Sequence, residues 1–197
     1  WLEQNTLDKN HALTPYHSEL NAPRFGTLQA EDGQLMHYRM FEPTNIEAGK
    51  HYPVIVSVYG GPHAQRVTNS WSPRDLYLHY LVQQGYMVFQ LDNRGSYNRG
   101  KAFEDPIYKK LGIVEIADQI KGVEYLRSLP YVDAKHIGIY GHSYGGYMTI
   151  MAMFKAGDYF TAGVSGAPVT DWALYDTHYT ERYLGHPADN AQGYIDS

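Results

Sequence analysis

The stretch Gly-His-Ser-Tyr-Gly-Gly at residues 141–146 has the form Gly-x-Ser-x-Gly, and the rest of the chain is arranged around it. An apolar run, residues 137–140, precedes it and suits a buried strand, whereas residues 144–156 suit a helix that ends at Gly157. A strand, a tight turn and a helix in this order predict a nucleophile elbow, which holds a serine hydroxyl at the end of a sheet. Flanking glycines fit because so tight a turn strains the backbone and leaves no room for side chains. We therefore interpret Ser143 as a nucleophile.

Strands and helices are expected to alternate on both sides of the elbow. An Asp-Gly turn at residues 31–33 joins residues 27–30 and 34–41 into a predicted β-hairpin. Further strands are expected at residues 52–59, 86–91 and 160–164, and helices at residues 76–84 and 116–127. Apolar residues recur at helical spacing in the second helix, with Glu115 and Asp118 at its start. This alternation predicts an α/β fold with a mostly parallel sheet and helices on both faces.

Composition excludes several classes of function. The chain has 197 residues, 43 % of them apolar, which is enough for one large domain or for one domain and a short piece of another. Its net charge is −5, and its acidic and basic residues are interspersed. The sequence has no Lys/Arg cluster of the kind that would predict a nucleic-acid partner. It contains no cysteine, and its histidines lack metal-site spacing, so we predict neither a metal nor another cofactor. No apolar run is long enough to span a membrane, and the first residues lack a signal-peptide pattern.

A serine nucleophile needs oxyanion donors and a base. The backbone N–H of Tyr144 is the expected first donor, and the second should come from the loop after the strand at residues 52–59. Tyr59 opens that loop, and its hydroxyl either reaches the same point or merely packs. No base is evident. In a catalytic triad built around such an elbow, the acid and the histidine normally follow later strands of the sheet. Only one strand is expected after Ser143, so we interpret His178 and His186 as surface or pocket residues.

Residues 169–183 are dense in aromatic side chains. Trp172, Tyr175 and Tyr179 fall at intervals of three and four, which predicts one face of a helix. Such a stripe either belongs to the core or forms the wall of a flat apolar slot near the elbow.

Four blocks together resemble the prolyl oligopeptidase family of serine peptidases, and most closely its dipeptidyl peptidase IV branch. They are Val-Tyr-Gly-Gly-Pro at residues 58–62, Asp-Asn-Arg-Gly-Ser at 92–96, the elbow extended to Tyr147, and Tyr-Asp-x-x-Tyr-Thr-Glu-Arg-Tyr at 175–183. The resemblance runs from about residue 24 to the end of the chain. It implies an α/β-hydrolase fold that is incomplete at its C-terminus.

The resemblance also implies roles for particular residues. Ser143 would be acylated, and the Tyr59 hydroxyl and Tyr144 N–H would form the oxyanion hole. A pocket for the proline ring would be lined by Tyr144, Val169, Trp172, Tyr175 and Tyr179. The branch removes X-Pro and X-Ala dipeptides from free N-termini, so the implied partners are peptides with proline or alanine second.

The resemblance further implies a domain organisation. Residues 1–22 would be a connector from a preceding β-propeller, which in the family carries the acidic residues that bind the substrate amine. Residues 23–197 would be a partial catalytic domain, because the family's catalytic Asp and His fall after residue 197. We therefore expect the isolated chain to be inactive. The family also suggests a secreted or periplasmic enzyme and a homodimer formed through regions outside these residues.

One departure leaves alternatives open. The branch often has tryptophan between the glycine and serine of the elbow, where this chain has His142. A neighbouring subgroup, an acylaminoacyl-peptidase or a prolyl oligopeptidase, is therefore a second hypothesis. A third is a non-catalytic binding protein that has kept the fold.

Overall fold

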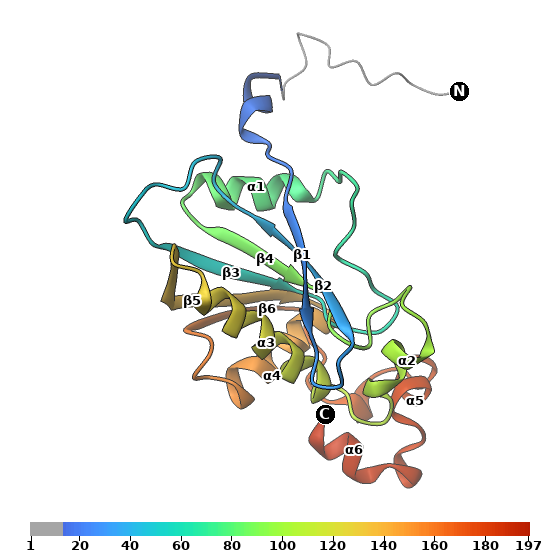
Figure 1. The fold of residues 1–197 in the computed structure, drawn as a ribbon. Helices are drawn as coiled ribbons and strands as arrows, with labels where there is room; N and C mark the ends of the chain where they lie inside the picture. Colours follow the sequence, from blue (N-terminus) through green and yellow to red (C-terminus); the bar gives the residue numbers. More distant parts are fainter. Residues whose placement is uncertain (1–13) are drawn as a thin grey trace, which may run out of the picture.

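A computed structural model describes residues 14–197 and shows a six-stranded sheet between two layers of helices (Figure 1). The strand order is β1-β2-β4-β3-β5-β6. The strands are β1 (Arg24–Gln29), β2 (Leu35–Phe41), β3 (Tyr52–Val58), β4 (Met87–Leu91), β5 (Val132–His142) and β6 (Ala162–Gly166). Pairings β1–β2 and β2–β4 are antiparallel, whereas β4–β3, β3–β5 and β5–β6 are parallel. The predicted hairpin and the mostly parallel sheet are confirmed.

Three longer helices connect the parallel strands. They are α1 (Asp75–Gln83), α3 (Val114–Ser128) and α4 (Tyr144–Lys155). The short elements are η1 (Thr14–Glu19), α2 (Lys101–Glu104), η2 (Asp105–Ile107), η3 (Trp172–Leu174), α5 (Thr177–Leu184), η4 (Pro187–Asp189) and α6 (Ala191–Asp196). None of the helices in residues 14–197 has both the length and the apolarity that crossing a membrane requires.

Adjacent residues of β4 show how the two faces of the sheet are covered. Phe89 belongs to the main core, which includes Val123 of α3 and Met148 of α4. Val88 points the other way and joins a small cluster with Leu78 of α1. Since successive side chains of a strand alternate between faces, α1 covers one face and α3 and α4 cover the other. All of β4 is buried, as expected for a central strand of such a sheet.

One predicted strand needs correction. The strand predicted at residues 160–164 is displaced toward the C-terminus, because β6 spans Ala162–Gly166. Within the expected connector at residues 1–22, Thr14–Glu19 forms a 3₁₀ helix. Residues 1–13 of that connector lie outside the described residues.

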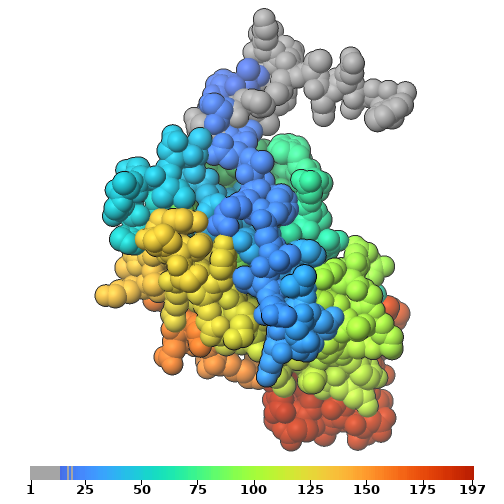
Figure 2. Space-filling view, in the orientation of Figure 1, coloured from blue at the N-terminus to red at the C-terminus, as the bar shows by residue number. Residues whose placement is uncertain are grey.

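The C-terminal elements pack against the segment that follows β4 (Figure 2). The backbone N–H of Lys109 donates to the Tyr183 carbonyl over 2.7 Å. Asn190 Nδ2 donates to the Lys109 carbonyl over 3.0 Å. The chain after β6 is thereby held at the end of the sheet where the elbow lies.

Candidate active site

Ser143 lies between β5 and α4 in a strained conformation. Its φ and ψ are 59° and −119°, a combination that L-residues with side chains rarely adopt. The backbone around it is fixed from two sides, since Ser143 N–H donates to the Gly166 carbonyl over 2.9 Å and Tyr147 N–H donates to the Ser143 carbonyl over 3.0 Å. The strand, strained serine and helix predicted from Gly-x-Ser-x-Gly are all present.

The glycines of the elbow are required by close backbone contacts. A Cβ at Gly141 would lie 2.3 Å from the Gly145 carbonyl oxygen, and one at Gly145 would lie 2.3 Å from the Val58 carbonyl oxygen. Backbone atoms of packed strands cannot move aside as a flexible side chain can. The elbow therefore sits directly on the end of β3, where Tyr59 begins the next loop.

The two predicted oxyanion donors lie on adjoining segments, one at the start of α4 and one directly after β3. The backbone N–H of Tyr144 is at the first position of α4, where helical N–H groups have no partner within the helix. The ring of Tyr59 lies 6.0 Å from the Tyr144 ring, centroid to centroid. Burial raises the pKa of the Tyr59 phenol, although the Arg66 charge opposes this shift. The hydroxyl is therefore neutral at physiological pH and can donate a hydrogen bond.

The polar block at residues 92–96, directly after β4, holds in place the loop that begins at Tyr59. The carboxylate of Asp92 accepts from the backbone N–H groups of Arg66 and Val67, over 2.8 and 3.0 Å. Asn93 Nδ2 donates to the Gly60 carbonyl over 2.9 Å. In the sequence, this block indicates only the family resemblance. Its position directly after a buried strand was the signal that it supports a site.

The aromatic residues after β6 form a cluster, but the prediction that they share one helix is wrong. Trp172 lies in η3, Tyr179 lies in α5, and Tyr175 lies between them. Asp171 accepts from the backbone N–H of Ala173 over 2.8 Å and Asp176 accepts from that of Tyr179 over 2.9 Å. Each aspartate caps a separate helix start, and this local bonding breaks the segment in two.

The cluster nevertheless lies next to the elbow. The Trp172 and Tyr179 rings stack at 6.1 Å with an interplanar angle of 9°, and Tyr175 meets both rings edge-on. Tyr144 contacts Trp172 at 5.7 Å. Trp172 is 2 % exposed, so it supports the aromatic cluster from within. Tyr175 is 43 % exposed and presents its ring to solvent. Val169 is half-buried and packs against the same core.

A strained serine at an elbow, candidate donors on the adjoining segments and an aromatic cluster beside them are the arrangement expected of an acyl-transferring hydrolase. The family model that matches residues 71–197 is that of the prolyl oligopeptidase family. The chain belongs to the prolyl oligopeptidase family. The sheet is accordingly that of an α/β-hydrolase, and the family places the chain among the serine peptidases.

Several proteins with similar sequences are named as dipeptidyl peptidases. It is 41 % identical to mouse (Mus musculus) dipeptidyl peptidase 8 over 174 residues, which are 87 % of this chain and 20 % of that protein. It is 35 % identical to dipeptidyl peptidase 4 of Trichophyton equinum over 196 residues, which are 98 % and 25 % of the two chains. These similarities place the chain on the dipeptidyl peptidase IV branch.

Solved structures agree with this placement. A crystal structure from Bacteroides ovatus, assigned to dipeptidyl aminopeptidase IV, matches with a TM-score of 0.84 and 47 % identity. Porphyromonas gingivalis dipeptidyl peptidase 4 matches with a TM-score of 0.82 and 38 % identity. Each match covers 89 % of this chain and 25 % of the other. The chain thus spans a fifth to a quarter of the length of the relatives named here.

Among residues 14–197, no histidine hydrogen-bonds to the Ser143 hydroxyl. His63 pairs with Arg182, His136 pairs with Asp133, and His186 accepts from a backbone N–H in its own turn. His178 is exposed on α5. Among the described residues, no group of three His, Cys, Asp or Glu side chains is arranged to hold a metal ion.

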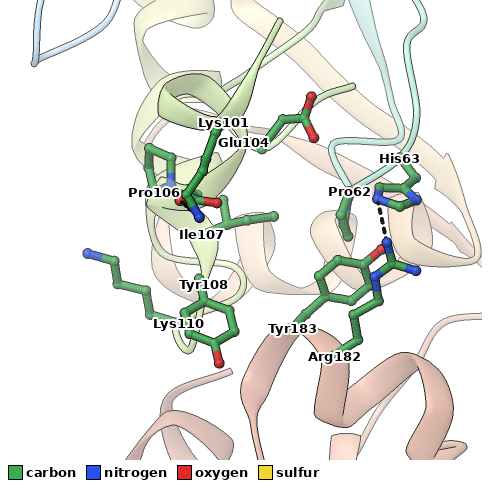
Figure 3. Close-up of a pocket in the computed structure, with 12 residues that line it drawn as sticks. Pro62, His63, Lys101, Glu104, Pro106, Ile107, Tyr108, Lys110, Arg182 and Tyr183 are labelled. Atoms are coloured by element: carbon green, nitrogen blue, oxygen red, sulfur yellow. Dashed lines mark hydrogen bonds and ion pairs between the residues drawn. The ribbon is translucent and has the colours of Figure 1, made fainter. Parts of the chain in front are cut away.

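A cavity of about 520 Å³ adjoins the aromatic cluster (Figure 3). Tyr183 of α5 lines it and also contacts Tyr179, with ring centroids 4.9 Å apart. Arg182 and His63 meet on the same side, with Arg182 Nη2 and His63 Nε2 separated by 3.4 Å. The far wall consists of α2, η2 and the residues after them, including Lys101 and Lys110. The aromatic cluster therefore continues into an open, polar cavity.

Proposed function

We propose that this chain supplies the nucleophile, the oxyanion hole and the proline pocket of a dipeptidyl peptidase that removes X-Pro and X-Ala dipeptides from free peptide N-termini. The observation that carries the proposal is Ser143 at a strained turn between the Tyr59 loop and the aromatic cluster. The names of the relatives, dipeptidyl peptidases 4 and 8, support the release of dipeptides.

The chemistry follows from the geometry of the elbow. The Ser143 oxygen attacks the carbonyl carbon of the substrate's second residue while its proton passes to the base that the rest of the natural protein supplies, and the carbonyl oxygen becomes an oxyanion. The Tyr144 N–H and the Tyr59 hydroxyl donate to that oxygen, stabilising the charge where it develops. The C–N bond then breaks as the amine takes up that proton, which leaves the dipeptide esterified to Ser143; water attacks this ester, releases the dipeptide acid and restores the Ser143 hydroxyl. The step gains most from donors that are already fixed before the charge forms.

The aromatic cluster gives the proposed preference for proline. Tyr175 and Tyr179, backed by the buried Trp172, present flat apolar surfaces against which a pyrrolidine ring buries area without needing a hydrogen-bond partner. A bulky side chain does not fit between such walls, whereas alanine fits with a smaller gain in buried area. The proposed order of preference is therefore proline, then alanine, then larger residues.

We further propose that residues 23–197 are part of a catalytic domain whose acid and base come from elsewhere in the natural protein. The reason is that no histidine in residues 14–197 hydrogen-bonds to the Ser143 hydroxyl. Residues 1–22 would connect this domain to a preceding one. The isolated chain should not turn over peptide substrates. Turnover by the isolated chain that disappears in Ser143→Ala would contradict this.

The deciding experiment compares Gly-Pro-p-nitroanilide with its N-acetylated form, using the protein at its full natural length. Cleavage of the free amine alone is the expected result, and it requires an amine-binding group outside the site described. Cleavage of the acetylated form would instead indicate an acylaminoacyl-peptidase or an oligopeptidase, with Ser143 and the oxyanion hole unchanged. Cleavage of neither form would favour a non-catalytic binding protein.

A further inference from the structure

A buried carboxyl lies directly behind the elbow. Glu115, at the start of α3, is 0 % exposed. Its Oε1 accepts from the Tyr144 hydroxyl over 2.6 Å and from the Gly112 backbone N–H over 3.0 Å. Its Oε2 has no hydrogen-bond partner among the described residues. A carboxyl in such a place costs free energy, so its contact with Tyr144 calls for an explanation.

Tyr144 connects this carboxyl to every part of the proposed site. Its backbone follows Ser143, and its ring lies 6.0 Å from the Tyr59 ring and 5.7 Å from Trp172. The base of the ring fills the space beside Gly61, where a Cβ would approach it to 2.5 Å. The phenol is the one polar tip of a side chain that is otherwise enclosed. A shift of that tip would therefore be transmitted to the elbow, the Tyr59 loop and the pocket wall together.

We propose that Glu115 is a positioning residue, which holds the Tyr144 phenol and thereby fixes the Tyr144 N–H and the pocket wall. This inference rests on the proposed function, because the N–H matters only as an oxyanion donor. Glu115 does not touch the substrate in this scheme. It acts through Tyr144 alone.

The hydrogen bond does not require a charged carboxyl. The groups that face Glu115 are the phenols of Tyr144, Tyr147 and Tyr179 and the carboxylate of Asp118, which is itself paired with Arg94. A proton on Oε2 would leave Oε1 free to accept from Tyr144 as before. Glutamine offers the same acceptor oxygen in the same place. The acceptor is therefore the feature needed, and Glu115→Gln should preserve it.

The test uses the protein at its full natural length and the variants Glu115→Ala, Tyr144→Phe, their double variant and Glu115→Gln. Glu115→Ala and Tyr144→Phe each remove the hydrogen bond, and each should lower kcat for Gly-Pro-p-nitroanilide by about tenfold, with KM changed less than about threefold. The double variant should lose no more than the single ones, because both remove one interaction. Glu115→Gln should recover most of the lost kcat. Glu124→Ala, at an exposed position of the same helix, is the matched control.

A merely structural role would give a different pattern. Folded Glu115→Ala and Tyr144→Phe with kcat within about twofold of the wild type, or with losses that multiply in the double variant, would overturn the proposal. Labelling of Ser143 by a fluorophosphonate distinguishes failure of the Glu115 inference from failure of the proposed function, because labelling uses the oxyanion donors but needs no peptide. Protein that labels but cleaves no dipeptide substrate refutes the specificity, while the labelling rates of the variants still test Glu115. Protein that neither labels nor cleaves refutes both.

Discussion

Glu115→Gln should make the stability of the protein less dependent on pH. Burial raises the pKa of Glu115 from 4.5 to about 7, although hydrogen bonds from Tyr144 and Gly112 oppose the shift. Between these values the folded protein keeps a proton that the unfolded chain releases. Stability from this group is therefore complete below about pH 4.5 and is lost as the pH rises toward about 7. Glutamine carries no such proton, so the variant should not show this loss.

The size of the effect follows from the shift. The interval from 4.5 to about 7 corresponds to about 3 kcal/mol at 1.36 kcal/mol per pKa unit. About 2–3 kcal/mol of this falls between about pH 5 and about pH 8. The free energy of unfolding of Glu115→Gln, relative to the wild type, should rise by that amount over this range. Other titrating groups are common to both proteins and cancel in the difference.

Urea unfolding followed by tryptophan fluorescence at about pH 5 and about pH 8 measures this difference. Trp172 is a suitable probe, because it is buried 5.7 Å from the Tyr144 ring. Glu124→Gln is the control, since Glu124 has 47 % side-chain exposure in the same helix and should change stability by less than about 1 kcal/mol. A stability difference between Glu115→Gln and the wild type that is equal at both pH values would refute the reasoning.

Three further outcomes are expected. Tyr59→Phe should reduce kcat of the full-length enzyme by about 10²–10³, the usual loss for one oxyanion donor, and a change below about threefold would mean that Tyr59 only packs. Tyr175→Ala should reduce cleavage after proline more than cleavage after alanine, because it removes a pocket wall at a site with 43 % exposure; equal losses on both substrates would contradict the pocket assignment. Asp118→Ala should cost about 2–3 kcal/mol in urea unfolding, because it removes the carboxylate that binds the buried Arg94 guanidinium at 2.7 Å and leaves Asp32, at 3.0 Å, as its remaining ion-pair partner. Lys121→Ala, at an exposed position of the same helix, should leave the urea midpoint nearly unchanged, and similar losses of stability in the two variants would show that the Arg94 pair contributes little.

The major elements could be predicted from the sequence because each has a local cause. The β-branched run of β3, the helical spacing in α3 and the Asp-Gly turn of the hairpin act within a few residues. The elbow was predictable for the same reason, since its glycines prevent collisions within a short stretch and with the adjoining strand. The aromatic segment shows the limit of periodicity. Its spacing matched one helix, but Asp171 and Asp176 were already present as capping residues that end that pattern.

The sequence by itself determined the order of strands and helices, the serine at the elbow and the residues available to line a pocket. Only the tertiary structure decided which distant residues the polar side chains contact. Glu115 reads in sequence as an acidic residue that favours a helix start, yet it is buried against Tyr144, 29 positions away. Asp92 likewise holds the loop that carries Tyr59. Local patterns fix backbone conformation, whereas the face on which a polar side chain lands depends on how distant elements pack, and no short-range signal records that.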